Sequence, residues 1–158
     1  HRIMKITYIQ PFYQATKDIF RIMMDLDVQR GDLRVIKDLI PSREVNVIVG
    51  ATGDLSGSIL YSFPTNLTLA MVKIMSGMEL SKLDSFVLSA VGEVANIISG
   101  NAMTYLSANN YTCDITPPQV MRGTTHSLSM ATDLALVIPV QSAIGDFEIN
   151  IALKETKA

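Results

Sequence analysis

The chain has 158 residues, of which 48% are hydrophobic and 18% charged, and this size and composition predict one well-packed domain. The formal net charge of −2 and the absence of a Lys/Arg cluster argue against nucleic-acid binding, and the single cysteine, Cys113, excludes an internal disulfide and fits a reducing compartment. There is no signal-peptide pattern and no uninterrupted apolar run of membrane-spanning length, so we expect a cytoplasmic protein that does not enter a membrane.

The first three residues, His1 to Ile3, precede Met4 and resemble the remnant of an expression tag, so we expect the domain to comprise residues 4–158. Apolar residues then recur with helical spacing between Tyr8 and Leu26, and Pro11 is tolerated in the first turn of a helix. This segment is expected to form an amphipathic helix whose apolar face comprises Phe12, Ile19, Phe20, Ile22, Met23 and Leu26.

The next segment, residues 28–43, is polar and predicts a loop or a poorly defined edge strand around Leu33 to Ile36, for which we derive no function. A β-hairpin follows, because Glu44 to Thr52 and Gly57 to Phe63 are two β-rich runs around a Gly/Asp turn. The glycines near this turn also suit a phosphate-binding loop. The Gly-Lys-Ser/Thr ending and a directly following helix are missing, however, so we favour the hairpin.

Two helices are expected after the hairpin. Pro64 opens the first, which runs to about Ser76, and Gly77 stops it. The second is longer and covers about Ser81 to Asn109. At roughly 100° per residue, it places a thin polar stripe on an otherwise core-forming helix. The stripe contains Ser85, Ser89, Glu93, Asn96 and Gly100, whereas Val87, Val91, Val94 and Ile98 lie on the other side.

This polar stripe has two interpretations. An amphipathic helix needs a solvent face, and Ser, Glu and Asn side chains would provide one. A solvated face of this length usually carries several Lys and Glu residues, however, and here Glu93 is the single charge. Glu93 and Asn96 lie one turn apart. The carboxylate can bind a cation on a partner, and the carboxamide can hold a water molecule by donating and accepting at once.

The rest of the chain is rich in predicted β-structure. A short strand at Thr112 to Thr116 precedes the rigid pair Pro117-Pro118, and Val120-Met121 continues the apolar pattern. Ser127 to Gln141 and Phe147 to Lys154 are predicted as two strands joined by a tight turn. The order of elements predicts a mixed α/β fold of the α+β type, in which an antiparallel-rich sheet carries the long helices on one face.

No constellation of metal ligands accompanies these elements. His126 has no second His or Cys at ligand spacing, and Cys113 has no accompanying His. We therefore expect structural roles for both residues and no metal site in this chain.

The stripe also resembles a known sequence signature. Ser89-x3-Glu93-x2-Asn96, followed by Pro118 twenty-two positions after the Asn, resembles the signature of the CheC/CheX/FliY family of chemotaxis phosphatases. The short sequence segments at residues 91–96 and 99–102 are similar to those of the family as well. CheC proteins carry a second Glu-x-x-Asn pair, which the first helix lacks here, and residues 9–16 resemble the first helix of CheX. The resemblance therefore favours a CheX-type member with one site.

This resemblance implies a CheC/CheX-like fold and a phosphatase that acts on the aspartyl phosphate of the response regulator CheY. It implies that Glu93 pairs with a Lys of the regulator and fixes the docking, and that Asn96 orients the attacking water. Further residues would contact the partner, namely Ser85, Ser89, Gly100 and Pro118. The Mg²⁺ would be supplied at the active site of the regulator, so no cofactor bound tightly by this chain is expected.

A noncatalytic, dimeric interaction or scaffold module that uses the same helix only as a surface is the alternative function. A homodimer is expected in either case. The runs Val45 to Val49 and Ala135 to Ile138 are strongly apolar, and a monomeric sheet would leave one such strand as an open edge. Pairing with a second copy would satisfy that edge, and the resemblance to CheX-type proteins implies dimers joined through their sheets.

Overall fold

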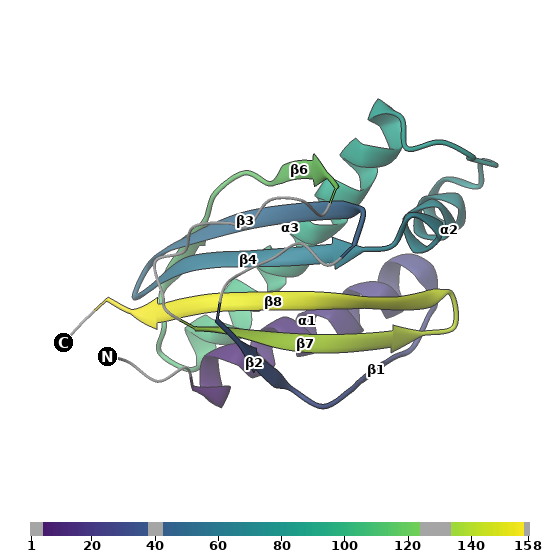
Figure 1. Cartoon of the computed structure of the whole chain (residues 1–158). Coiled ribbons are helices and arrows are strands. Elements are labelled where there is room, and N and C mark those ends of the chain that lie inside the picture. Colours follow the sequence, from purple (N-terminus) through teal and green to yellow (C-terminus); the bar gives the residue numbers. More distant parts are fainter. Residues whose placement is uncertain (1–4, 38–42, 124–133, 157–158) are drawn as a thin grey trace.

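Three helices and one antiparallel sheet make up the parts of the chain that the computed structural model describes, residues 5–37, 43–123 and 134–156. The helices α1 and α3 lie behind the strands in Figure 1, so they cover one face of the sheet. This arrangement confirms the predicted α+β fold. The elements are α1 (Ile6–Met24), β1 (Val28–Arg30), β2 (Arg34–Ile36), β3 (Val45–Gly53), β4 (Leu55–Phe63), α2 (Thr65–Ser76), α3 (Ser85–Ala108), β5 (Cys113–Ile115), β6 (Gln119–Arg122), β7 (Ala135–Ser142) and β8 (Gly145–Glu155).

The sheet has the strand order β1-β7-β8-β4-β3-β5, and in addition β2 pairs with β7 and β6 pairs with β3. Its register places apolar residues opposite one another across the central strands. Ile59 of β4 is the partner of Val49 on β3 and of Ile151 on β8, and Ile151 is in turn the partner of Leu136 on β7. Because side chains alternate between faces, this row of four points to one side of the sheet, toward the helices.

The hydrophobic core lies between that face and the helices. The rings of Phe20 on α1 and Phe147 on β8 stack with centroids 5.3 Å apart, and Phe63 on β4 lies 4.9 Å from Phe147. Full burial of a large apolar side chain stabilises the fold by about 1.5–3 kcal/mol, so this layer fixes how each helix is rotated. The long helix α3 contributes Val87, Val91, Val94, Ala95, Ile98, Ala102 and Leu106.

Helix α3 is also apolar and long enough to cross a membrane by length and composition, with a mean hydropathy of 1.3 over its best 18-residue window. In this fold 44% of that window is buried inside the protein, and the helix packs on α1, β3 and β5. The apolar character that would suit a membrane span by composition is thus used, in this fold, to pack α3 against the rest of the domain.

The first helix differs from its prediction at two residues. It begins at Ile6, so Pro11 falls in the second turn, and the missing N–H of Pro11 leaves the carbonyl of Thr7 without its usual helical donor. The side chain of Asn109, just beyond α3, donates to that carbonyl at 3.3 Å. Ile22 was predicted on the apolar face but is 75% exposed, because the buried face passes through Ile19, Phe20 and the half-buried Met23 instead.

The hairpin and the two helices predicted after it are confirmed. Strands β3 and β4 flank a turn at Asp54, and Gly53 adopts a φ of +112°, which favours glycine. No helix follows this turn directly, so the phosphate-loop alternative is excluded. Gly77 ends α2 in the left-handed conformation, as expected for a helix stop.

The predicted open edges are wrong. Strand β3, with Val45 to Val49, lies between β4 and the pair β5 and β6, and β7, with Ala135 to Ile138, lies between β8 and the pair β1 and β2. Strands of three or four residues cover both. The short strand predicted at Thr112 to Thr116 is confirmed as β5, and an edge strand near 33–36 was anticipated, but the sequence did not indicate that such strands pair with β3 and β7. The tag remnant at 1–3, His126 and the first part of the predicted strand at 127–141 lie outside the described residues.

Candidate functional site

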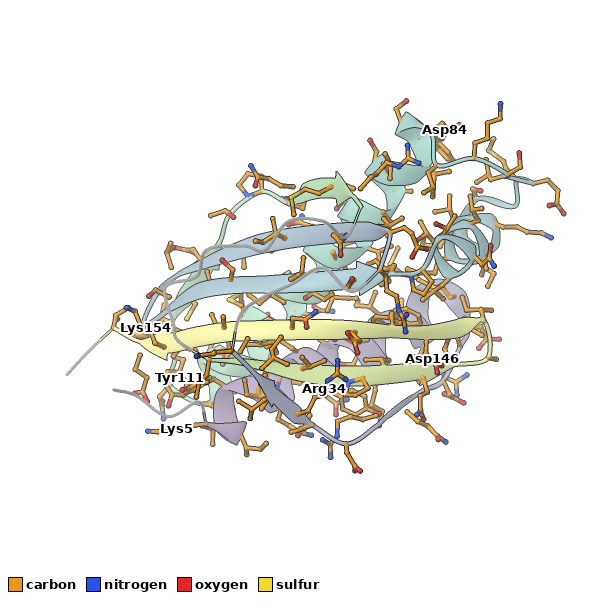
Figure 2. All side chains as sticks on the ribbon, viewed as in Figure 1. Lys5, Arg34, Asp84, Tyr111, Asp146 and Lys154 are labelled. Atoms are coloured by element: carbon orange, nitrogen blue, oxygen red, sulfur yellow. The ribbon has the colours of Figure 1, made fainter. Side chains whose placement is uncertain are left out.

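The polar stripe of α3 faces away from the core, as its periodicity predicts. Asp84 caps the helix by accepting a hydrogen bond from the Val87 N–H at 3.0 Å, and Figure 2 shows Asp84 at the end of α3 that rises above the sheet. Ser85, Ser89 and Glu93 are exposed, and Asn96 and Gly100 are half-buried. All five therefore share the side of the helix that the core leaves open.

Glu93 and Asn96 form the chemical centre of this stripe. They lie three residues apart on the helix and project from the same side. Neither side chain makes a hydrogen bond or an ion pair with any residue that the structure describes. Their hydrogen-bonding capacity is therefore available to water or to a partner.

A buried hydrogen-bond pair beneath the stripe holds α3 in its rotation. The Ser99 hydroxyl donates to the carbonyl of Ala95 at 2.8 Å, so the fully buried Tyr61 hydroxyl, 2.8 Å from Ser99, is the donor to Ser99. Burial raises the pKa of Tyr61 well above its ordinary value and keeps the phenol protonated as that donor. Because Ser99 directly precedes Gly100, this contact fixes which way the end of the stripe points.

Gly92 lets strand β6 approach the buried side of the same helix. A Cβ at this buried position would lie 2.9 Å from Cγ2 of Val120, closer than such atoms normally come. Pro118 is half-buried and immediately precedes β6, so the close contact at Gly92 also determines where Pro118 lies. No role for Gly92 was predicted from the sequence, although a glycine inside a helix is a detectable signal of close packing.

Gly100 has a different environment. A Cβ there would meet no atom within 4 Å, so the fold itself gives no steric reason for a glycine at this position. Glycine inside a helix costs about 1 kcal/mol relative to alanine. A smooth, side-chain-free spot on the stripe is therefore suited to close approach by a partner.

A groove between α1 and α3 begins where the stripe ends, and it was not predicted from the sequence. Its volume is about 540 Å³. Tyr105 donates a short hydrogen bond to Asp18, which raises the pKa of the tyrosine, and Gln14 donates to the same carboxylate at 3.0 Å. The groove is lined by Lys17, Asp18, Arg21, Ile22, Asp27, Asn101, Thr104 and Tyr105.

Ligands for a metal do not gather in the described parts of the chain. Within these ranges, no group of three or more His, Cys, Asp or Glu side chains is placed to hold a metal ion. Cys113 is half-buried, and its burial raises the pKa of the thiol, so the thiolate is disfavoured at neutral pH. What the stripe offers is a carboxylate to bind a cation and a carboxamide to orient water.

Comparison with known proteins agrees with this geometry. The family model described as chemotaxis phosphatase CheX matches residues 45–141, a range that includes all of α3 and Pro118. The chain is also 30% identical over 144 residues to the CheY-P phosphatase CheX of Thermotoga maritima, and the match covers 90% of each protein.

Solved structures share the fold. A chemotaxis protein CheX from Desulfovibrio desulfuricans is 31% identical, with a TM-score of 0.84 and coverage of 94% of this chain and 100% of that one. The CheX of Borrelia burgdorferi, solved in complex with CheY, BeF₃ and Mg²⁺, is 30% identical, with a TM-score of 0.75 and coverage of 96% and 100%.

Proposed function

Because the chain belongs to the CheX family of chemotaxis phosphatases, we propose that it hydrolyses the aspartyl phosphate of a phosphorylated CheY-type response regulator. The observation that carries this proposal is the pair Glu93 and Asn96, which stands without an intramolecular partner among the described residues on the open side of α3. The CheX of Borrelia burgdorferi, which forms a complex with CheY, supports the choice of partner.

In the proposed mechanism, α3 lies across the phosphorylation site of the regulator. Glu93 pairs with the Lys of that site and fixes the docking, while the Asn96 carboxamide holds a water molecule in line with the phosphorus. Attack by this water breaks the bond between phosphorus and the aspartyl oxygen and releases inorganic phosphate and the free carboxylate. An acyl phosphate is already reactive, so positioning that lowers the barrier by roughly 3 kcal/mol would accelerate the reaction by about two orders of magnitude.

The Mg²⁺ in this mechanism belongs to the regulator. Glu93 is the single carboxylate on the stripe, whereas a Mg²⁺ site normally uses several oxygen ligands in octahedral geometry. The chain itself therefore supplies a cation partner and a water-orienting amide, and we expect it to bind no cofactor tightly.

The rest of the stripe is proposed to contact the regulator around this centre. Ser85 and Ser89 are exposed on the N-terminal side of Glu93, and Gly100 lies one turn beyond Asn96. Pro118 immediately precedes β6, whose Val120 approaches Gly92 on α3, and it would form the rim. These small side chains present little bulk, which favours close approach of the partner.

Three further properties are proposed with this function. The protein acts in the cytoplasm, where its regulator would be found, and residues 4–158 form one domain, for which the continuous sheet gives support. It acts as a homodimer that presents two stripes, each engaging one regulator.

The alternative function is a noncatalytic scaffold. Such a scaffold would bind the regulator without releasing phosphate, so the assay below separates the two functions.

The test is inorganic phosphate release from a phosphorylated CheY-type regulator in the presence of Mg²⁺. Asn96→Ala is expected to abolish the stimulated rate while regulator binding persists, because the water loses its orienting group. Glu93→Ala is expected to weaken binding as well, because a charge-assisted pair is lost. Asn66→Ala removes an exposed carboxamide from α2 and serves as the matched control. Full activity in a folded Asn96→Ala variant would exclude the water-orienting role.

A further inference from the structure

We propose that the groove between α1 and α3 is the second part of the regulator-docking surface, with Ile22 as its apolar anchor. This inference rests on the proposed function, because the occupant is the same regulator that the stripe engages. It adds helix α1 to an interface that the Glu-x-x-Asn motif alone would confine to α3. The groove residues lie outside that motif.

The groove is continuous with the stripe. Thr104 lines the groove and lies one turn beyond Gly100, the last residue of the stripe, so the groove begins next to the end of the stripe on α3. Eight residues separate Asn96 from Thr104, which corresponds to about 12 Å along the helix axis. A standard interface covers about 800 Å² on each partner, or roughly 15 Å in radius, so a regulator centred on Glu93 and Asn96 extends over the groove.

Ile22 is the side chain that gains most from being covered. It is 75% exposed, the highest exposure among the large hydrophobic residues that the structure describes, and it lies on the wall of the groove. The solvent-exposed surface of Ile22 does not contribute to the stability of the folded chain. Anchor residues of interfaces are typically apolar groups that a ring of polar contacts seals from water, and Ile22 is placed to be such an anchor.

The polar groups around Ile22 are already held in position. Asp18 accepts hydrogen bonds from Tyr105 and Gln14, and Arg21 forms ion pairs with Asp25 and Asp27 at 3.0 and 2.8 Å. These side chains pair with one another within the chain, so a partner that covers Ile22 need not supply polar groups for them. The lining also contains two cations and two anions, Lys17 and Arg21 against Asp18 and Asp27, so it suits a neutral, apolar patch of the regulator rather than a strongly charged one.

The experiment compares Ile22→Ser with Ile6→Ser. Ile6 is the same residue type on the same helix and is also exposed, at 57%, but it lies 16 residues away, about 24 Å along the axis. Binding is measured to a regulator held in its active form with beryllofluoride and Mg²⁺, and turnover is measured with the phosphorylated regulator. Ile22→Ser is expected to weaken binding about tenfold and to raise KM similarly with kcat unchanged. Ile6→Ser is expected to match the wild type.

The outcomes separate this inference from the proposed function. Wild-type binding and KM in Ile22→Ser would overturn the docking role of the groove and leave the phosphatase activity standing. Weakened binding in Ile22→Ser, together with no phosphate release by the wild type, would support the docking surface and overturn the catalytic proposal. Equal losses in Ile22→Ser and Ile6→Ser would also overturn the inference, because the effect would then not be specific to the groove.

Discussion

Gly100 occupies a position in α3 where a Cβ would meet no described atom within 4 Å beyond the neighbouring backbone of its own helix. Gly92, eight residues earlier on the same helix, has Val120 only 2.9 Å from where its Cβ would be. One glycine is thus required by packing inside the fold, and the other is not. Gly100 lies on the stripe, and contact with the regulator there is the proposed reason for a glycine at this position.

Gly100→Ala is therefore expected to have opposite effects on stability and on docking. Alanine is the better helix former, so the free energy of unfolding should rise by up to about 1 kcal/mol. The added methyl group would stand between α3 and the regulator, so KM should rise several-fold. Denaturant unfolding and phosphate-release kinetics measure the two effects, and a stabilised variant with unchanged KM would show that the regulator does not pack on Gly100.

For single residues, helical periodicity was sufficient to predict which side chains of α3 lie on the stripe. Ser85, Ser89 and Glu93 are exposed and their apolar counterparts are buried because a helix with one buried face has a single consistent rotation. Periodicity failed for Ile22, because an apolar residue at a face boundary can lie on either side. The groove beside it could not be predicted, since it depends on how two helices distant in sequence pack together.

At the level of secondary-structure elements, the contact between α3 and β6 links the fold to the proposed site. Strand β6 pairs with β3 through four residues and also packs on α3, and the closest approach is Val120 against Gly92. Because Pro118 leads into β6, any change in this distance also moves the proposed rim of the site. The position of β6 and the proposed rim of the site are in this way linked at one glycine.

Gly92→Ala should lower both the stability of the fold and the rate of phosphate release. The overpacked methyl group should cost about 1–3 kcal/mol, which exceeds the gain of up to about 1 kcal/mol from helix propensity, and phosphate release should fall as β6 is displaced. Val120→Ala in the same chain should restore much of the stability and activity, because it removes the clashing Cγ2. Gly100→Ala is the stability control on the same helix. If the double variant is no better than Gly92→Ala alone, the contact with Val120 is not the cause.

Sequence patterns predicted the long elements of this fold more reliably than the short ones. The hairpin of β3 and β4 has nine residues in each strand and strong turn chemistry at Gly53, so it was recognisable. Strands β1 and β2 have three residues each, and pairing with β7 rather than local propensity makes them strands. Strand β1 was not predicted, β2 was anticipated only as a poorly defined edge strand, and the pairing of neither with β7 was predicted, so the sheet edges were assigned wrongly.

With β3 and β7 covered, the described sheet ends in short strands on both sides, β1 and β2 along β7 and β5 and β6 along β3. The second pair packs on α3, the helix that carries the stripe, so a dimer formed there would be expected to crowd the regulator. Strand β2 lies at the other side of the sheet and carries Val35, an apolar residue that is 62% exposed. Pairing of β2 with its copy would cover Val35 and leave both stripes open.

We therefore expect light scattering at micromolar concentration to give about twice the chain mass of 17.3 kDa. Val35→Lys places a charge on the β2 edge, where lysine commonly prevents strand pairing, and should shift the protein toward the monomer with phosphate release per chain retained. Ile74→Lys makes the same kind of change at an exposed position of α2 and should leave the mass unchanged. A monomeric wild type would remove the homodimer from the proposed function. A dimer that persists in Val35→Lys would place the interface on another surface.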